Sequence, residues 1–370
     1  MPIQTASVEK LQSFLTNAIN WDLVRDKKIA GIVGDTPSKY AKSPTVWNAA
    51  FEALGLAAIF FPFDVREENL ESLIEAIRQE PRFLGVSVTV PYKIRVIAFL
   101  DELDPKAKAI GAVNTVVRTA EGRLIGYNTD GQGGMDSLLK LPAGTTSPFL
   151  ETLKGMNVLL IGAGGAARSL AFYLAELLQG GRLFLANRAV EKAERLCADL
   201  KKWNAKTEPL PEKEISKVVK SVNLIINAST KGQQGLRYSP DGAMTCLEPY
   251  SALASASPPS LPSGSEENFF SRWTLGALKD IEKNNQKSFA MLLETPSKTF
   301  LFDIIYAPLE TIFLRQGRWT GHRTLNGKMM NIAQAADAFY HKVVKSFLQE
   351  KGLYTPTTYP QLLQAMTAKW

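Results

Sequence analysis

Short apolar runs and longer amphipathic stretches alternate over the first part of the chain. Three apolar runs have the length of a β-strand, and Pro91 follows the last of them: residues 29–35, 57–65 and 83–90. Two stretches between them carry apolar side chains at helical spacing: residues 43–56 and 68–80. Strands that alternate with helices are typical of a largely parallel sheet. We therefore predict an α/β domain here.

Local signals at the ends of these elements predict where helices begin. Ser43 and Pro44 are the residue types that favour a helix cap and a first helical turn, so we predict a helix start at Ser43. Ahead of the first strand, four apolar side chains are spaced as on one helix face: Leu11, Phe14, Leu15 and Ile19. This spacing predicts an amphipathic helix and a lead-in over residues 1–27.

The alternation of strands and helices resumes in the second half. Residues 155–200 are typical of strand, glycine turn, helix, strand, turn and helix, and further strands are expected within 221–230 and 298–308. Residues 141–149 are rich in Pro, Gly, Ser and Thr, which predicts a linker. The chain ends with an expected helix over 331–352 and a short tail.

One internal segment has a low-complexity composition. Residues 251–267 are rich in Ser, Pro and Gly, and we expect a flexible surface segment without chemistry there. It lies within a longer insertion over residues 239–297.

The composition excludes several classes of protein. At 370 residues, 45% of them hydrophobic, the chain suits two globular domains. No apolar stretch approaches the roughly 18 residues of a membrane span, and the N-terminus lacks the pattern of a signal peptide. Two cysteines provide neither a disulfide framework nor a thiolate metal site. We therefore expect a cytoplasmic protein without a metal and without a membrane partner.

The charged and ionisable residues narrow the ligands and the chemistry. The net charge of +7 is spread along the chain without a basic block, which favours anionic small molecules over nucleic acid. His322 and His341 are the only histidines, too few for a three-histidine zinc site. If the protein is an enzyme, lysine or a carboxylate must move the proton.

A glycine-rich motif follows the first strand of the second half. Residues 162–167 (GAGGAA) have the form G-x-G-x-x-A, between an apolar strand and an apolar helix. Gly162 permits a tight turn, Gly164 lets the backbone approach a pyrophosphate, and Ala167 permits close packing of helix and strand. The N–H groups at the helix start would face the phosphates. A ligand-free tight turn is the alternative, and the context favours a dinucleotide site at Gly162, Ala163, Gly164, Gly165 and Ala166.

The end of the next strand bears on the choice of dinucleotide. An NAD enzyme offers a carboxylate to the ribose there, whereas this chain has Asn187 and Arg188, with Lys192 one turn later. Cations favour the additional phosphate of NADP. Glu191 stands nearby, so NAD stays open as the alternative cofactor.

Several motifs together resemble the shikimate dehydrogenase family. Polar clusters interrupt the first domain where strands end, and they are followed in order by the glycine turn and later motifs: SKYAKSPTVWN (38–48), SVTVPYK (87–93), GAVNT (111–115), NTDG (128–131), GAGGA (162–166), NR (187–188), NAST (227–230), Asp303 to Tyr306 with Pro308, and NGKMMNIAQ (326–334). The resemblance covers roughly residues 29–345.

The resemblance implies roles for individual residues. Lys93 matches the family's catalytic lysine and Asp130 its partner aspartate, which agrees with the need for a proton-transfer group other than histidine. The implied substrate contacts are Ser43, Ser87, Thr89, Asn114, Tyr306 and Gln334, with Tyr40 as an added candidate. The later motifs add three residues to the expected cofactor site: Asn227, Ser229 and Gly327. Ser43 alternatively serves as a helix cap, and Gln334 as a surface residue.

The departures from the family pattern concern the substrate. The family has an S-x-S-P loop, which corresponds to residues 41–44 here. Ala41 replaces its first serine, and Tyr40 precedes it. Ser87 stands in place of an asparagine, and Trp47-Asn48 in place of a common histidine-asparagine pair. Losing one hydroxyl that binds a carboxylate costs about 1.5–3 kcal/mol. Either Tyr40 replaces that hydroxyl, or the pocket takes a relative of shikimate such as quinate or an amino-substituted analogue.

The resemblance implies a fold and an activity. We expect an N-terminal α/β substrate domain over residues 1–135 and a Rossmann NADP-binding domain over 136–324, with the C-terminal helix returning to the first domain over 325–370. The expected reaction is the reversible NADP-dependent reduction of 3-dehydroshikimate to shikimate, in a cleft between the domains that closes on its ligands. A dehydrogenase for another ring carboxylic acid is the first alternative, and a non-catalytic ligand sensor the second. For the oligomeric state, we expect a monomer or a homodimer.

Overall fold

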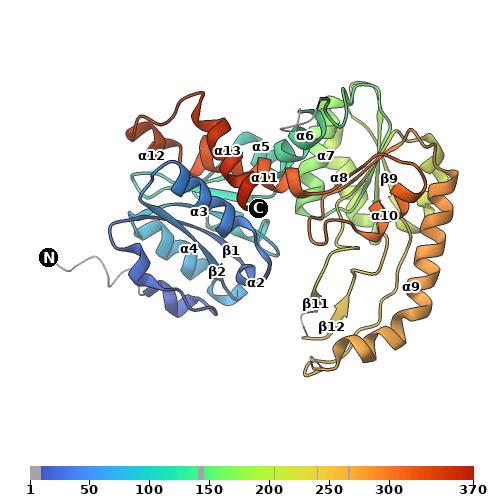
Figure 1. Ribbon diagram of the computed structural model, residues 1–370, viewed down its shortest axis with the longest axis horizontal. Helices are drawn as coiled ribbons and strands as arrows, with labels where there is room; N and C mark the ends of the chain where they lie inside the picture. Colours follow the sequence, from blue (N-terminus) through green and yellow to red (C-terminus); the bar gives the residue numbers. More distant parts are fainter. Residues whose placement is uncertain (1–9, 141–145, 204, 240, 266) are drawn as a thin grey trace. The chain divides into compact units, whose positions relative to one another are not determined.

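The computed structural model describes residues 10–140, 146–203, 205–239, 241–265 and 267–370. The chain divides into two compact units (Figure 1). Unit 1 comprises Met1–Asp136 and Asn331–Trp370, and unit 2 comprises Ser137–Met330. Both boundaries fall inside helices, since α6 spans Asp130–Leu139 and α11 spans Lys328–Asp337. Of the expected linker, residues 141–145 lie outside the described residues.

Unit 1 is built on a mixed six-stranded sheet in the order β2-β1-β3-β5-β6-β4. Its strands are β1 Lys28–Gly34, β2 Ala58–Asp64, β3 Phe83–Val88, β4 Glu102–Leu103, β5 Thr115–Arg118 and β6 Leu124–Tyr127. The first three strands are parallel, as the alternating pattern predicts. The hairpin β5–β6 adds antiparallel pairs with β3 and within itself, so the sheet is only partly parallel.

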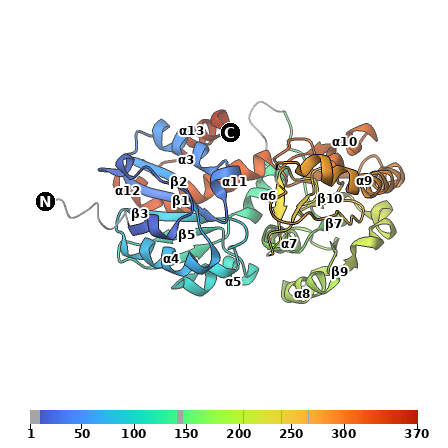
Figure 2. The ribbon, with the colours of Figure 1, turned by 90° about the horizontal axis from the view of Figure 1, so that it is seen from below.

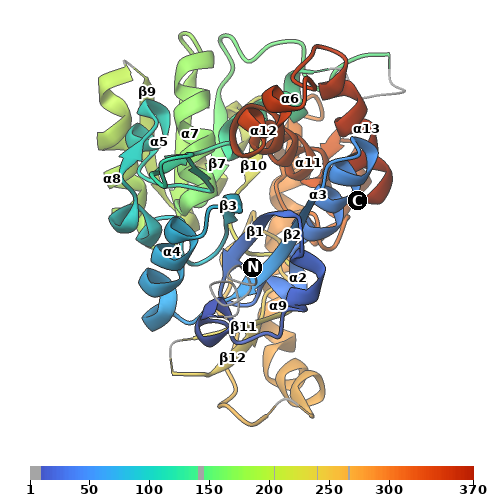
Figure 3. The same cartoon turned by 90° about the vertical axis from the view of Figure 1, so that its left-hand side faces the viewer.

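Helices cover both faces of this sheet (Figure 2). Its helices are α2 Pro37–Tyr40, α3 Ser43–Ala53, α4 Leu70–Gln79, α5 Pro105–Ile110, α12 Lys345–Glu350 and α13 Thr358–Lys369, besides parts of α6 and α11. α3 and α13 lie on one face and α4 on the other (Figures 2 and 3). Apolar side chains of α4 and the parallel strands form one continuous core, which includes Ile74, Ile77, Val33 and Val86.

The helix predicted near the N-terminus is wrong in its described part. Lys10–Phe14 and Trp21–Val24 are short 3-10 helices, and Leu15 pairs with Val65 beside the sheet. The Gln12 carboxamide oxygen accepts hydrogen bonds from Ile19 N and Trp21 Nε1 at 3.0 and 3.2 Å. These contacts fold the segment back on itself. Its first 3-10 helix packs against α4 and its second against β2.

Three further predictions about the helices need correction. Ser43 is the first residue of α3 and not its cap, since Lys42 occupies the cap position without a side-chain hydrogen bond. The single C-terminal helix is interrupted by a π-helix over Ala338–Val343. The expected tail instead contains α13, which buries Leu362 and Met366 and packs along α3, where Gln361 Nε2 donates to Ala53 O at 3.0 Å.

Unit 2 contains a six-stranded parallel sheet in the order β14-β13-β10-β7-β8-β9. Its strands are β7 Val158–Ile161, β8 Arg182–Asn187, β9 Lys206–Pro211, β10 Leu224–Asn227, β13 Phe300–Asp303 and β14 Thr324–Leu325. Helices α7 Gly165–Leu177 and α8 Val190–Leu200 cover one face, and α10 Ile312–Trp319 the other (Figure 2). The strand order reverses between β7 and β10, the place where doubly wound sheets bind ligands.

The insertion carries more structure than its composition predicts. It contains α9, a helix over Phe269–Glu294, and part of a hairpin formed by β11 Leu236–Tyr238 and β12 Met244–Cys246 (Figure 1). The expectation that residues 251–267 form a flexible surface segment is wrong at its start, where Ser251, Ala252 and Leu253 are fully buried. Asn284 of α9 bonds both the N–H and the carbonyl of Ser251, which allows this polar segment to be buried.

None of the helices among the described residues combines the length and the apolar character that crossing a membrane requires.

Candidate active site

Lys93 is anchored through its backbone beside the end of β3. Val113 N donates to Lys93 O at 2.7 Å, and Val88 N, the last residue of β3, donates to Asn114 O at 2.7 Å. The buried Tyr92 hydroxyl donates to Val65 O at 2.8 Å. Neighbouring segments therefore hold the turn that carries Lys93 on both sides.

The side chain of Lys93 forms an ion pair with Asp130, the first residue of α6. Lys93 Nζ lies 2.6 Å from Asp130 Oδ2, and the two side chains are 18% and 8% exposed. Asp130 is fixed by its own backbone, because Asp130 N donates to the Asn128 side chain at 3.1 Å. The structure thus brings together the two expected catalytic residues in unit 1, nearly shielded from water.

Asn114 connects this pair to two further polar side chains. Its Nδ2 donates to Asp130 Oδ1 at 2.8 Å and to Thr129 Oγ1 at 3.0 Å, and lies 3.4 Å from Gln334 Oε1. Its Oδ1 accepts from Thr129 N at 2.9 Å. The carboxylate of Asp130 is therefore shared between an ammonium and an amide, which keeps the ammonium next to the Asn114 side chain.

Gln334 reaches this network from α11. Its Oε1 accepts from Thr129 Oγ1 at 3.3 Å, and its Nε2 donates to Asn331 O at 3.0 Å. The Asn331 side chain in turn accepts from Trp370 Nε1 at 3.0 Å. The half-buried Gln334 is thus part of the polar cluster, and the alternative of a surface glutamine does not hold.

At the start of α3, Ser43 offers a hydroxyl that is not engaged by any described residue of the protein. Ser43 is 7% exposed, and no hydrogen bond of its side chain is found in the described part of the chain. Ser38 Oγ donates to the buried Asp64 carboxylate at 2.5 Å. The Tyr40 hydroxyl donates to Asp35 Oδ1 at 3.1 Å, so it is already engaged with a carboxylate of the protein.

The remaining candidates of unit 1 lie at the end of β3. Ser87 pairs with Ile32 of β1, and Thr89 N donates to Val33 O at 2.9 Å. Both side chains are half-buried. Gly34 leaves room for Thr89, because a Cβ at Gly34 would lie 2.5 Å from the Thr89 methyl group.

Trp47 and Asn48 serve the core of unit 1. The Trp47 indole is fully buried against Phe51, Phe60 and Phe339. Asn48 exchanges two hydrogen bonds with the backbone of Phe60, at 3.0 and 2.9 Å. Both side chains therefore hold α3 against β2.

In unit 2, the glycine motif stands at the carboxyl ends of three paired strands. Ile161, Asn227 and Asp303 are level in the sheet. Gly162 follows Ile161 with φ of 118°, and a Cβ there would lie 2.6 Å from Ala228 O. Gly164 caps α7 without a side-chain bond and has open space where a Cβ would stand. The turn 162–166 thus forms a backbone cradle at a helix start, which suits a pyrophosphate.

The end of β8 presents exposed cations. Asn187 Nδ2 donates to Ala189 O at 2.8 Å and Lys192 N to Ala189 O at 3.1 Å, which shapes the turn into α8. The side chains of Arg188 and Lys192 are exposed, and neither forms an ion pair among the described residues. This edge suits a phosphate group better than a bare ribose.

Asn227 organises the neighbouring loop from inside the protein. It is fully buried, and its Nδ2 donates to Lys231 O and Asp303 Oδ1, both at 3.0 Å. Its Oδ1 accepts from the hydroxyl and the N–H of Ser229 at 2.7 and 3.0 Å. Asn227 therefore holds the loop in place through contacts within the protein, and Ser229 lies half-buried at its turn.

Asp303 completes this network at the end of β13. Its carboxylate also accepts from Thr311 Oγ1 at 2.7 Å and from Ile305 N at 3.0 Å. Complete burial raises its pKa to about 7, against the opposing effect of these donors. Gly327 packs on the adjoining strand end, since Gly327 N donates to Ile305 O at 2.9 Å and a Cβ there would meet Ile304 O. Tyr306 lies half-buried in the same loop.

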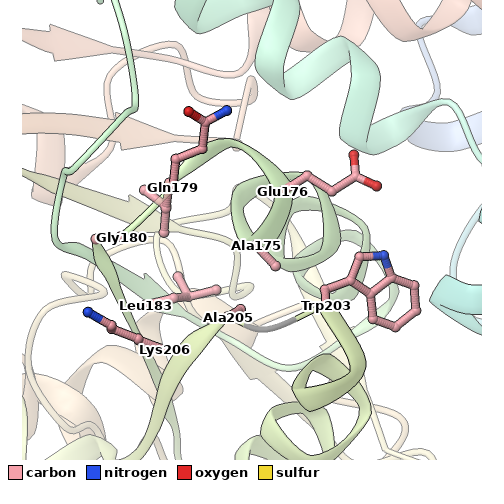
Figure 4. Close-up of a pocket in the computed structure, with 10 residues that line it drawn as sticks. Ala175, Glu176, Gln179, Gly180, Leu183, Trp203, Ala205 and Lys206 are labelled. Carbon is pink, nitrogen blue, oxygen red and sulfur yellow. The ribbon is translucent and has the colours of Figure 1, made fainter.

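A cavity of about 400 Å³ lies elsewhere in unit 2, beside the C-terminal end of α7 (Figure 4). Trp203, Leu183 and Glu176 are among its lining residues. Gly164 stands at the opposite end of the same helix, so this cavity is not the predicted dinucleotide site. Among the described residues, no group of three or more His, Cys, Asp or Glu side chains is placed to hold a metal.

Comparison with known proteins relates both halves of the chain to known families. Residues 32–116 match the shikimate dehydrogenase substrate binding domain, and residues 146–238 match the shikimate / quinate 5-dehydrogenase family. The NADP(+) shikimate dehydrogenase of Carboxydothermus hydrogenoformans is 34% identical over 316 residues, which cover 85% of this chain and 91% of that protein. The chain belongs to the shikimate dehydrogenase family. A second relative of the same name, from Methanococcus maripaludis, is 31% identical over 84% of this chain and 90% of its own length.

Solved structures of the shikimate dehydrogenase family share the fold. The Thermus thermophilus enzyme in complex with NADP(H) and shikimate superposes with a TM-score of 0.61 at 25% identity, over 93% of this chain and all of that one. The predicted fold class, an α/β substrate domain followed by a Rossmann domain with a returning C-terminal helix, is confirmed.

Sequence reasoning missed several residues that shape these two candidate sites. Thr129 donates to Gln334, Thr311 donates to Asp303, and Lys231 pairs with Glu212 in unit 2. Thr129 lies inside the recognised NTDG motif, so the sequence could have indicated that it belongs to the site. Lys231 follows a recognised motif directly, whereas nothing in the sequence points from it to Glu212.

Proposed function

We propose that this protein catalyses the reversible NADP-dependent reduction of 3-dehydroshikimate to shikimate, a step of the chorismate pathway. The observation that carries the proposal is the shielded Lys93–Asp130 ion pair, with Asn114 bonded to the same carboxylate. A binding protein has no need for such a proton-transfer pair, which argues against the alternative of a non-catalytic sensor.

The residues at the carboxyl ends of the strands in unit 2 fit a dinucleotide cofactor. The backbone cradle at residues 162–166 would hold the pyrophosphate, and Arg188 with Lys192 the additional phosphate. The bound cofactor supplies or accepts the hydride. Ser229 and Gly327 stand on loops beside Gly162 and Ile304 and would border the nicotinamide end.

The residues of unit 1 orient the ring and move the proton. In the reductive direction, the Lys93 ammonium donates a proton to the carbonyl oxygen of the substrate while the ring carbon gains a hydride, so that a secondary alcohol forms. Asp130 holds the Lys93 side chain and shares its proton. Asn114, Thr89 and Gln334 would bind ring hydroxyls, and Ser43 the carboxylate. Enclosure of the pair strengthens these contacts.

A second substrate class is favoured by one specific observation. At position 41 the S-x-S-P loop has alanine, and the hydroxyl of Tyr40, the candidate replacement for the serine, is bonded to Asp35. Ser87 is also shorter than asparagine. These changes leave fewer donors and more space around the ring, which favours quinate or another substituted ring acid as a second substrate.

The test is turnover of purified protein with a panel of ring acids and both nicotinamide cofactors. We expect oxidation of NADPH with 3-dehydroshikimate and reduction of NADP with shikimate, each faster than with NADH or NAD. Faster turnover of quinate would favour the second substrate class. Absence of turnover with every member of the panel would overturn the assignment as a dehydrogenase.

A further inference from the structure

Lys231 is a buried cation directly after the loop that borders the glycine motif. It is 8% exposed, and its Nζ lies 2.6 Å from Glu212 Oε1 and 2.5 Å from Ala254 O. Glu212 follows β9, whereas Ala254 belongs to the insertion. One side chain therefore joins three segments that are distant in sequence.

The loop that Lys231 ends is in direct contact with the cofactor cradle. Ala228 O and Ser229 N lie 2.6 and 3.1 Å from the position of a Cβ on Gly162. Within the loop, Lys231 N donates to Ser229 Oγ at 3.3 Å, and Lys231 O accepts from Asn227 Nδ2 at 3.0 Å. A displacement of Lys231 would therefore shift Ser229 against Gly162.

The contacts of the Lys231 side chain continue into α9. Ala254 O accepts from Asn284 Nδ2 at 2.8 Å, as well as from Lys231. Asn284 is fully buried and also binds Ser251. The buried start of the insertion is thus attached to α9 on one side and to the cofactor loop on the other.

A buried ion pair of this kind costs free energy of desolvation, so it is weak evidence for a gain in stability. Burial lowers the pKa of Lys231, and the Glu212 carboxylate opposes this effect. The pair lies outside the strands of the sheet, and its geometry fixes the loop at Lys231 relative to the 3-10 helix that begins at Glu212. Positional specificity explains its presence better than stability does.

We propose that the Lys231–Glu212 pair is a positioning device for the cofactor loop over residues 227–231, and that it couples the insertion at Ala254 to dinucleotide binding. This inference rests on the proposed function, since it assumes that the loop binds NADP. Lys231 acts through Ser229 and Asn227 and does not itself touch the cofactor.

The test compares the affinity for NADPH, the KM for the ring acid and the unfolding temperature of the intact protein. Lys231→Met/Glu212→Gln removes both charges together, so that no buried charge is left unpaired. We expect this double variant to fold with a melting temperature near that of the wild type. Its Kd for NADPH, from nicotinamide fluorescence, should rise about tenfold, the effect of losing one charged hydrogen bond, with an unchanged KM for the ring acid.

Lys220→Met/Glu294→Gln is the matched control, because it makes the same two changes at an exposed ion pair of unit 2. It should bind NADPH as the wild type does. Glu212→Asp keeps both charges but shortens the reach, and it should raise the Kd by a smaller factor even if the double variant does not fold.

If the double variant binds NADPH with wild-type affinity, the positioning role is overturned and the proposed function stays intact. If the double variant does not fold, wild-type affinity in Glu212→Asp leads to the same conclusion. A wild-type protein that binds no NADPH would instead overturn the proposed function, and the positioning role with it.

Discussion

The ammonium of Lys93 lies 2.6 Å from one carboxylate oxygen of Asp130, and the amide of Asn114 lies 2.8 Å from the other. Lys93 follows β3, Asn114 precedes β5, and Asp130 follows β6. Because these three strands are neighbours in the sheet, their ends bring the three side chains to one point. The strand ends therefore place an amine, a carboxylate and an amide together, the arrangement on which the proposed proton transfer depends.

Restoring the missing hydroxyl of the S-x-S-P loop should improve binding of the ring carboxylate. We expect Ala41→Ser to lower the KM for shikimate by about tenfold, because a hydrogen bond to a charged group contributes roughly 1.5–3 kcal/mol. Ser43→Ala should raise the same KM by about as much, with a smaller effect on kcat. Steady-state kinetics with varied shikimate measure both, and an unchanged KM in both variants would contradict the assignment of this loop to the carboxylate.

Arg188 should determine the preference between the two nicotinamide cofactors. Arg188→Gln removes an exposed cation at the end of β8, so we expect the KM for NADP to rise about tenfold or more and the KM for NAD to stay the same. Arg195→Gln is the control, since Arg195 is an exposed arginine of the following helix α8. An equal rise of the KM values for NADP and NAD would show that Arg188 does not bind the additional phosphate.

Much of the fold follows from local patterns in the sequence. β1, β7 and the turn at Gly162 are specified by apolar runs and glycines within a few residues of each other, so the sequence predicts them well. The pairing of Lys93 with Asp130 could be inferred because both residues lie in recognised motifs.

Other features depend on contacts between distant segments. Leu11 and Leu15 have helical spacing, yet their segment forms 3-10 turns held by Gln12 and packed against α4. The polar segment at Ser251 can be buried because Asn284 and Ser288 of α9 supply its hydrogen bonds. The partner of Lys231 is likewise set by the fold, since Glu212 begins a 3-10 helix after β9.

The buried carboxylate of Asp303 should make stability depend on pH. Burial raises its pKa from 3.8 to about 7, so the folded state binds a proton that the unfolded state releases between these values. Its contribution to stability is therefore fully present below pH 3.8 and is lost as the pH rises through 7.

Asp303→Asn removes this titration while keeping the shape of the side chain. We expect the free energy of unfolding of the wild type to fall relative to the variant by up to about 1.4 kcal/mol per pH unit between about pH 5 and 7. Urea unfolding of both proteins across this range measures the difference. A difference that stays constant with pH would show that Asp303 is ionised throughout.

The most direct test of the central claim is the single-turnover rate of NADPH oxidation by Lys93→Met with saturating 3-dehydroshikimate, measured beside its Kd for NADPH. Methionine keeps the length of the side chain and removes the proton donor. We predict that the rate falls by about a hundred- to ten-thousandfold, while the Kd for NADPH stays at the wild-type value because Lys93 belongs to unit 1. A Lys93→Met variant that oxidises NADPH at the wild-type rate would contradict the assignment of Lys93 and Asp130 as the proton-transfer pair.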